Sequence, residues 1–176
     1  RCLKAVANQS LDPSEFEIIV ADDDASLTTQ LQVVQLAVRA GCRIIYVPVS
    51  RAHGPAAARN AGVKVASGEL LAFTDDDCVP DTNWLRGGIA SFEDMSVDAA
   101  WGSLKMPLRD RPTDYERDAA RLSEAVFVTA NCFCRKAVFE SVGGFDPQFT
   151  SAWREDSDLF FTLIEQGFKV AFAEHA

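Results

Sequence analysis

The chain has 176 residues, which is enough for one domain with a full hydrophobic core. Its 17 basic and 26 acidic side chains give a formal net charge of −9, which argues against nucleic acid or an anionic membrane surface as the main partner. No apolar run reaches the roughly 20 residues that span a membrane, and the five cysteines lack the spacing of a metal site, so we expect reduced thiols.

Helices and strands alternate in the prediction for the first half of the chain, which opens on a helix. After the capping residue Ser26, apolar residues recur at helical spacing at Leu27, Leu31, Val34 and Val38. No strand precedes the first helix and the chain does not start with Met, so we expect an upstream segment to be missing. The predicted elements are a helix over 2–8, a strand over 16–21, a helix from 27, a strand over 43–47, a loop over 50–54, a helix over 55–66 and a strand over 70–73.

Two of these strands run into three consecutive aspartates. The strand over 16–21 leads into Asp22–Asp24, and the strand over 70–73 leads into Asp75–Asp77. Continuous apolar strands are typical of parallel sheets covered on both faces, and ligands of such sheets bind at the carboxyl ends of the strands. Adjacent carboxylates repel each other unless a cation lies there, and oxygen ligands suit Mg²⁺, Mn²⁺ or Ca²⁺. The alternative is a solvated acidic turn, because Asp is common in turns.

The second half of the chain has more polar connections and ends in an amphipathic helix with acidic residues in its first turn. Such residues are often only partners of the helix dipole. Apolar side chains of this helix are expected inside at Leu159, Phe160, Leu163 and Ile164. The predicted elements are a helix capped by Asp81 and running through Phe92, a strand over 98–106, a loop over 107–116, a helix over 115–125, a strand over 126–134, a helix over 136–142, a helix from 155 to Gly167 and a strand over 170–172.

Several short motifs follow one another in a specific order. They are Gly54-Pro55-Ala56-Ala57-Ala58-Arg59-Asn60-Ala61-Gly62, Ala66-Ser67-Gly68-Glu69, Phe73-Thr74-Asp75-Asp76-Asp77, Val142-Gly143-Gly144-Phe145-Asp146 and Glu155-Asp156-x-Asp158-Leu159. This ordered set resembles the family 2 glycosyltransferases of GT-A fold, and the resemblance covers nearly the whole chain. It implies an α/β fold with a Rossmann-like, mostly parallel sheet flanked by helices. It also implies a single domain over 1–176 that lacks its N-terminal strand and its C-terminal end.

The resemblance further implies how the chain binds a nucleotide-sugar donor. The residues implied to contact the nucleotide sugar are Asp22 or Asp23 at the nucleobase, Arg59, Asp75 near the ribose, and Asp76. Asp77, with Asp75, would bind a divalent metal, Mn²⁺ or Mg²⁺. Such an ion bridges acidic side chains to an anionic diphosphate and stabilises it as it leaves. Arg59 alone, near a helix start, has two interpretations: a surface salt bridge, or a guanidinium aimed at a nucleotide or carboxylate.

On the opposite side of the sugar, the family's pattern assigns Asp156 as general base and Glu155 as its neighbour near the acceptor. Trp153 and the segment Thr129, Ala130 and Asn131 would line the acceptor side. A base that deprotonates an attacking hydroxyl supports one displacement, which inverts the anomeric centre. The implied donor is a UDP-, GDP- or dTDP-sugar, and the implied acceptor is a glycan or a lipid-linked sugar. The family's usual setting is envelope polysaccharide synthesis, in the cytoplasm or at the cytoplasmic face of a membrane.

The chain departs from the family's pattern at Thr162, where an Arg is frequent. A late His approaches the metal in some relatives, and His175 either has that role or has none. Two other functions compete with sugar transfer. One is a module that binds nucleotide sugar and metal without turnover. The other is a phosphatase or nucleotidyltransferase with an aspartate cluster after a strand, for which Val79 fits the pattern. A phosphatase or nucleotidyltransferase would not explain the presence of Arg59 or of Glu155 followed by Asp156.

Overall fold

A computed structural model describes residues 1–50, 54–151 and 153–176, so the predicted loop over 50–54 lies mostly outside the described residues. Each helix and strand predicted in the first half of the chain is present, with ends shifted by a few residues at most. The elements are α1 (Cys2–Ala7), β1 (Glu17–Asp22), α2 (Leu27–Ala37), β2 (Arg43–Pro48), α3 (Pro55–Val65) and β3 (Leu70–Phe73).

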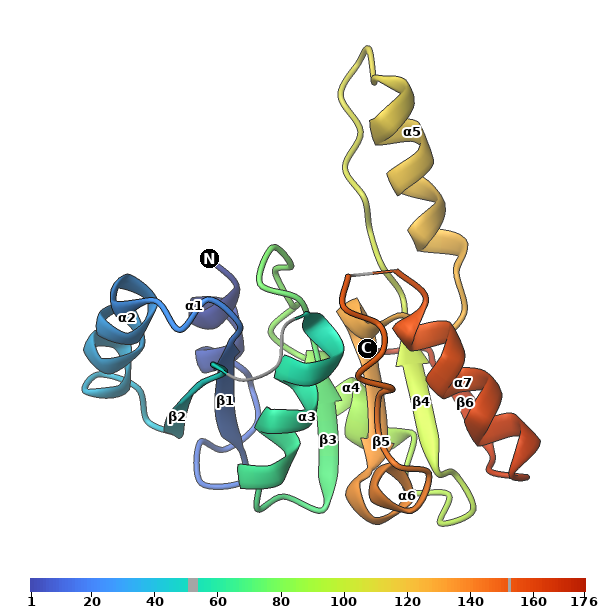
Figure 1. The fold of residues 1–176 in the computed structure, drawn as a ribbon, viewed down its shortest axis with the longest axis horizontal. Coiled ribbons are helices and arrows are strands. Elements are labelled where there is room, and N and C mark those ends of the chain that lie inside the picture. Colours follow the sequence, from blue (N-terminus) through green and yellow to red (C-terminus); the bar gives the residue numbers. More distant parts are fainter. Residues whose placement is uncertain (51–53, 152) are drawn as a thin grey trace.

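The second half contains shorter strands than predicted. The strands expected over 98–106 and 126–134 are wrong in length, because residues between β4 and β5 leave the sheet as an arm that carries α5 and projects from the body (Figure 1). Phe127 is fully buried with a φ of 55°, a value that strands do not adopt. The elements are α4 (Trp84–Ala90), β4 (Ala99–Gly102), α5 (Asp114–Ala120), a 3₁₀ turn (Arg121–Glu124), a second 3₁₀ turn (Thr129–Asn131), β5 (Cys132–Arg135), α6 (Lys136–Ser141), α7 (Glu155–Glu165) and β6 (Val170–Ala173).

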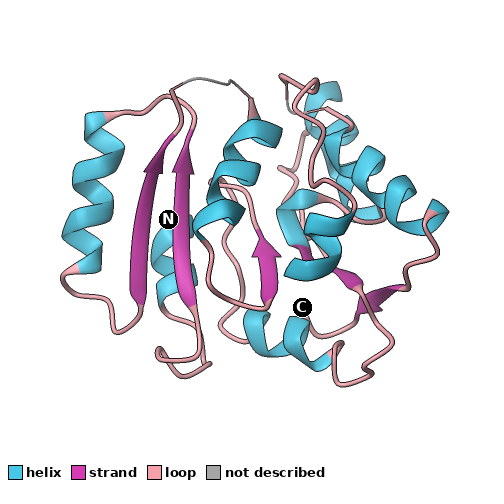
Figure 2. Cartoon of the chain, turned by 60° about the horizontal axis from the view of Figure 1, so that its bottom comes forward, coloured by secondary structure: helices cyan, strands magenta, loops and turns pink. Residues whose placement is uncertain are grey.

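The strands pair in two groups. β1 and β2 pair in parallel, and the other four strands lie in the order β3-β5-β4-β6. β5 runs antiparallel to both of its neighbours, whereas β4 and β6 are parallel. Among the described strands, β3 therefore pairs with the reversed strand β5. The prediction of a mostly parallel sheet holds for strand direction, because β1, β2 and β3 point the same way (Figure 2) and only β5 is reversed among the described strands.

Helices cover both faces of the sheet and create two hydrophobic cores. One core joins α1 and α4 to the sheet, and the other joins α3, α6 and α7 to it. β5 contributes to both, because successive side chains of a strand point to opposite faces. Phe133 lies in the first core, and its neighbours Cys132 and Cys134 lie in the second. Burial of the β5 side chains on both faces explains why this strand is apolar from Cys132 through Cys134.

The apolar stripe of α2 faces solvent. Leu27, Leu31, Val34 and Val38 are all exposed, and Val33 is the residue of the helix that is buried. Helical spacing therefore predicts the helix correctly but not the face that packs on β2. Ile164 of α7 is likewise exposed, contrary to prediction, while Leu159 and Leu163 are buried as predicted.

All five cysteines are free thiols. Burial raises the pKa of Cys134 to about 12. Burial and the neighbouring Asp75 and Asp77 raise the pKa of Cys78 to about 11.

Within the described residues, none of the helices combines the length and the apolar character needed to cross a bilayer.

Candidate functional site

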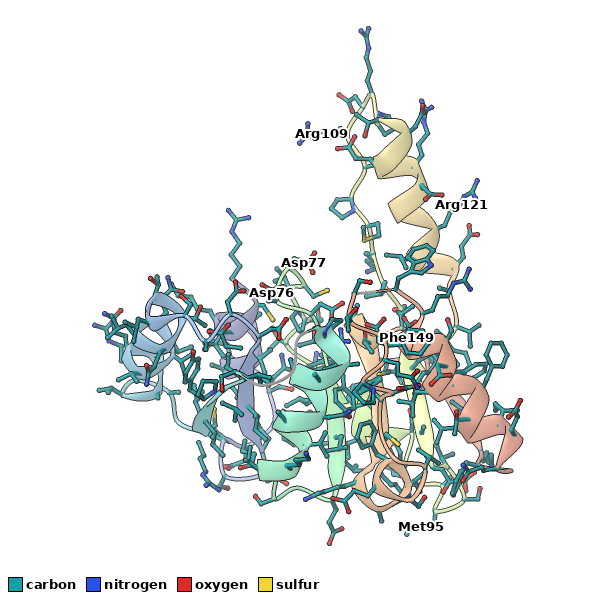
Figure 3. All side chains as sticks on the ribbon, viewed as in Figure 1. Asp76, Asp77, Met95, Arg109, Arg121 and Phe149 are labelled. Carbon is teal, nitrogen blue, oxygen red and sulfur yellow. The ribbon has the colours of Figure 1, made fainter. Side chains whose placement is uncertain are left out.

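The site lies at the carboxyl edge of the sheet. Figure 3 places Asp76 and Asp77 at the side of the molecule from which α5 projects, and Met95 at the opposite side. The start of α3 touches both aspartate clusters, because Gly54 bonds to Asp23 and Arg59 bonds to Asp75. The two clusters thus lie at one edge of the sheet, which is the placement that the sequence predicts.

The first cluster is bound into the backbone. The carboxylate of Asp22 accepts hydrogen bonds from the hydroxyl of Tyr46 at 2.8 Å and from the backbone N–H groups of Ser26 at 2.9 Å and Asp24 at 3.1 Å. Burial by itself would raise the pKa of Asp22, but these hydrogen bonds outweigh it and the pKa is lowered. Asp22 therefore holds the turn between β1 and α2 in place.

Asp23 points toward α3 instead. Its Oδ2 accepts a hydrogen bond of 2.8 Å from the backbone N–H of Gly54, the residue that precedes α3. Gly54 has a φ of 99°, and a Cβ there would lie 2.4 Å from the carbonyl oxygen of Thr150. Only glycine fits such a conformation and such a close approach. The close approach of Gly54 to Thr150 joins the start of α3 to the chain ahead of α7.

In the second cluster the carboxylates are more open. Asp75 pairs with Arg59 at 2.7 Å, and its side chain is 36% exposed. Asp76 and Asp77 are exposed, and their side chains emerge from the turn after β3 (Figure 3). The thiol of Cys78 donates a long hydrogen bond of 3.7 Å to Asp77. Asp77 is thus more exposed to solvent than Asp22, which is partly buried.

Among the described residues, no group of three His, Cys, Asp or Glu side chains is arranged to hold a metal ion. Asp77 and Asp75 offer oxygen atoms only, and Asp75 already shares one oxygen with Arg59. Mg²⁺ is usually held by one or two carboxylates together with substrate phosphates, rather than by a complete protein cage. The residues therefore fit an ion that arrives with a diphosphate, and they do not fit a metal bound by the protein alone.

The head of α7 carries the other group of acidic residues. Glu155 is 3% exposed and pairs with Arg59 at 2.8 Å. Asp156 is partly exposed and accepts a hydrogen bond of 2.7 Å from the backbone N–H of Ser157. Arg154, directly before the helix, has a φ of 76°, in the left-handed region that is unfavourable for a side chain. Its guanidinium lies over the ring of Trp153, which is 69% exposed.

The segment expected on the acceptor side is mostly buried. Asn131 is 5% exposed; it accepts a hydrogen bond from the indole N–H of Trp84 at 2.8 Å and donates one to the carbonyl of Ser103 at 2.9 Å. Thr129 is buried as well. The amide of Asn131 thus braces β4 against α4 in this structure, and its contact with an acceptor stays a prediction. Trp153, by contrast, is open to solvent.

Sequence reasoning gave no role to Asn60 and Phe145. Asn60 donates to the carbonyl of Phe145 at 2.7 Å and accepts from its N–H at 3.0 Å. The ring of Phe145 is fully buried and lies under the guanidinium of Arg59, 5.6 Å from it. Both residues belong to motifs identified in the sequence. The motifs alone do not predict that the side chain of Asn60 binds the backbone of Phe145 in a different motif.

Comparison with known proteins gives one family. The model of glycosyl transferase family 2 matches residues 1–147. Among curated proteins, the chain is similar to the glycosyltransferase AglE of Haloferax volcanii, with 28% identity over 98% of this chain and 59% of AglE. This chain therefore spans less than two thirds of the length of that relative.

Solved structures show the same fold. The chain is similar to TarS of S. aureus, with a TM-score of 0.76 and 20% identity over 99% of this chain and 32% of TarS. It is also similar to the mannosyltransferase PcManGT of Pyrobaculum calidifontis in complex with GDP-Man and Mn²⁺, with a TM-score of 0.75 and 21% identity over 97% of this chain and 49% of that protein. At these identities the likeness establishes the GT-A fold of this chain.

Proposed function

We propose, from the premise that this chain belongs to glycosyl transferase family 2, that it moves a sugar from a nucleotide-diphospho-sugar to a hydroxyl acceptor. The observation that carries the proposal is the meeting of two kinds of carboxylate at one sheet edge. Exposed carboxylates follow β3, and a second acidic group opens α7, with Arg59 between them. One group suits a metal-bound diphosphate and the other suits proton removal.

The donor side is assigned to the two aspartate clusters. Asp77, with Asp75, would hold Mn²⁺ or Mg²⁺, and the ion would neutralise the diphosphate as it leaves. The exposure of Asp77 supports this role, and Asp76 beside it is equally accessible to the nucleotide sugar. At the nucleobase we assign Asp23 rather than Asp22, because both oxygens of Asp22 already accept hydrogen bonds from within the chain.

The acceptor side is assigned to the head of α7. Asp156 would take the proton from the attacking hydroxyl, and its partial exposure supports that role, whereas Glu155 is buried against Arg59. The exposed ring of Trp153 is suited to stacking on an apolar sugar face. A single displacement assisted by one base inverts the anomeric centre. The acceptor would be a glycan or a lipid-linked sugar.

We also propose that the domain is completed by a strand ahead of Arg1, as the family resemblance implies. Among the described residues, β1 pairs only with β2 and β3 pairs only with β5, although β1 and β3 run in the same direction (Figure 2). The two strand edges that face each other can each bond to one further parallel strand. A longer version of the chain that carries the upstream segment should therefore unfold at a higher temperature than this one.

A calorimetric titration tests the donor site directly. The protein is titrated with UDP, GDP and dTDP, each with and without Mn²⁺. The proposal predicts that one nucleotide binds and that Mn²⁺ strengthens its binding. The absence of binding by any nucleotide, in the longer chain shown to be folded, would reject the donor site.

Product analysis separates an enzyme from a module that only binds. With the nucleotide sugar that binds best, the full-length protein should release the nucleoside diphosphate and form a product of inverted anomeric configuration. Asp156→Asn should abolish transfer while nucleotide binding is kept. Tight binding of nucleotide sugar without any product would favour the module without turnover, and a retained configuration would reject the single displacement.

A further inference from the structure

Arg59 lies where three parts of the fold meet. It belongs to the second turn of α3, and its side chain is 15% exposed. One terminal nitrogen of its guanidinium lies 2.8 Å from Glu155 at the head of α7, and the other lies 2.7 Å from Asp75 at the end of β3. The same guanidinium lies over the ring of Phe145. Both hydrogen-bonding arms of Arg59 are therefore engaged by carboxylates of the chain itself.

The neighbouring residue fixes this arrangement from below. Asn60 forms two hydrogen bonds with the backbone of Phe145, at 2.7 and 3.0 Å. Gly144 precedes Phe145 with a φ of 73°, and a Cβ there would lie 2.8 Å from the amide oxygen of Asn60. The ring of Phe145 is thus held in one place, and it limits where the guanidinium can lie.

The charges make the contact with Glu155 hard to replace. Glu155 is 3% exposed, and a buried carboxylate without a partner is strongly unfavourable. The side chain of Arg59 is itself only 15% exposed, and Glu155 and Asp75 both pair with it. Two carboxylates on separate nitrogens require the planar fork of arginine, which the single ammonium of lysine does not reproduce.

The position of Glu155 sets the position of Asp156, the next residue of the chain. Arg154, on the other side of Glu155, adopts a left-handed conformation with a φ of 76°. Non-glycine residues keep such a conformation only where the surrounding structure holds them in it. Arg59 pairs with Glu155 and also with Asp75, so it links the head of α7 to the end of β3.

We propose that Arg59 is a positioning residue that holds the head of α7 at a fixed distance from the end of β3. This inference rests on the proposed function, in which Asp156 deprotonates the acceptor and Asp77 binds the metal of the donor. Arg59 then acts on the reaction through Glu155 and Asp75. This role differs from the direct contact with the nucleotide that the family resemblance implies for Arg59.

A double-mutant cycle in the full-length protein tests the proposal, with the variants Arg59→Met, Glu155→Gln and the combination of both. A displaced reacting group costs about 100-fold in rate, so each single variant should lower kcat by about that factor. The double variant should lose little more than either single one, because the two side chains act as one unit. The KM for the donor and the Kd of the bare nucleotide should change less than about threefold.

Arg59→Lys provides a second variant that keeps the buried positive charge and hence the fold. Compared with Arg59→Met, it should recover more of the stability than of kcat, because the lysine pairs with one carboxylate at a time. Arg43→Met is the matched control: Arg43 pairs with Glu17 at 3.3 Å, and its side chain is 67% exposed. That variant removes an arginine–carboxylate pair away from the site and should match the wild type in every measurement.

Hydrogen exchange gives a readout that does not depend on turnover. In Arg59→Lys, backbone amides in the first turn of α7 should exchange faster, including that of Asp158, which bonds to the carbonyl of Arg154 at 2.9 Å. The amides of α2 should not change. If the wild type transfers no sugar, the proposed function fails, and the exchange data still decide whether Arg59 holds α7.

Three results would overturn the proposal. The first is additive losses of kcat in the double variant. The second is unchanged exchange at the head of α7 in Arg59→Lys. The third is a loss of nucleotide affinity above about tenfold with kcat unchanged, which would make Arg59 a direct contact of the nucleotide.

Discussion

The two aspartate clusters look alike in the sequence and differ in the structure. Each consists of three consecutive aspartates at the end of an apolar strand, and both lie at the same edge of the sheet. In the first, Asp22 accepts three hydrogen bonds from within the chain. In the second, Asp76 and Asp77 are exposed to solvent. The same motif therefore has a structural carboxylate at its first position in one cluster, Asp22, and two solvent-accessible carboxylates in the other, Asp76 and Asp77.

The difference follows from what surrounds each strand end. β1 is paired with β2, and Tyr46 of β2 reaches the carboxylate of Asp22. Next to the second cluster lies Arg59, which pairs with Asp75 and leaves Asp76 and Asp77 exposed. Carboxylates that accept hydrogen bonds within the fold contribute to stability, whereas exposed ones remain available to a cation. Substitutions can test this contrast.

The largest effect is expected at Asp77. Asp77→Asn should weaken Mn²⁺-dependent binding of the nucleotide by at least about 100-fold, because even residues that only support a metal ligand contribute 10–100-fold. The stability of the protein should hardly change, since Asp77 is exposed. Calorimetric titration with and without Mn²⁺ measures the loss. Asp24→Asn is the matched control, an exposed third aspartate of the other cluster, and equal losses in both variants would contradict the assignment.

A smaller effect on binding is expected at Asp23. Asp23→Asn should reduce nucleotide affinity by about tenfold, which corresponds to the loss of one hydrogen bond with a charged partner. The amide oxygen of the variant can still accept the hydrogen bond from Gly54, so the loop before α3 is kept. The loss should be the same with and without Mn²⁺. Asp22→Asn should leave the affinity unchanged, and the reverse outcome would move the nucleobase contact to Asp22.

Asp22 should affect stability instead. Asp22→Asn should lower the free energy of unfolding by about 1–2 kcal/mol, because an amide nitrogen cannot accept hydrogen bonds that the carboxylate accepts. Urea denaturation measures the change. Tyr46→Phe removes one of the donors, and its effect should be smaller in the Asp22→Asn background than in the wild type. Fully additive effects would show that the two side chains do not interact.

The stabilisation by Asp22 should also depend on pH. Its pKa is lowered in the folded state, so the contribution is present above the unfolded value of roughly 4 and is lost as pH falls through the folded value. The stability difference between the wild type and Asp22→Asn should therefore be constant near neutral pH and shrink in acid. Denaturation curves at several pH values below 5 measure it. A difference that grows as the pH falls would contradict the lowered pKa.

Local patterns predicted much of the fold. The strand of Ile18 and the strand of Leu71 were found from apolar runs, and the helix that starts at Pro55 was found from its proline. Where the prediction failed, tertiary structure decided. The strand expected over 126–134 begins only at Cys132, after the buried, left-handed Phe127 and a 3₁₀ turn. The exposed stripe of α2 shows that spacing defines a helix face but not what the face packs against.

For the site, the sequence by itself determined that carboxylates end two strands and open a late helix. It did so because the ends of strands and the starts of helices follow from local residue types. Only the tertiary structure decided that Asp22 is a structural carboxylate, that Asn131 is buried against Trp84, and that Arg59 joins Glu155 to Asp75. Arg59 and Glu155 lie 96 positions apart. No local propensity encodes such a pair, because it forms only when packing brings α3, β3 and α7 together.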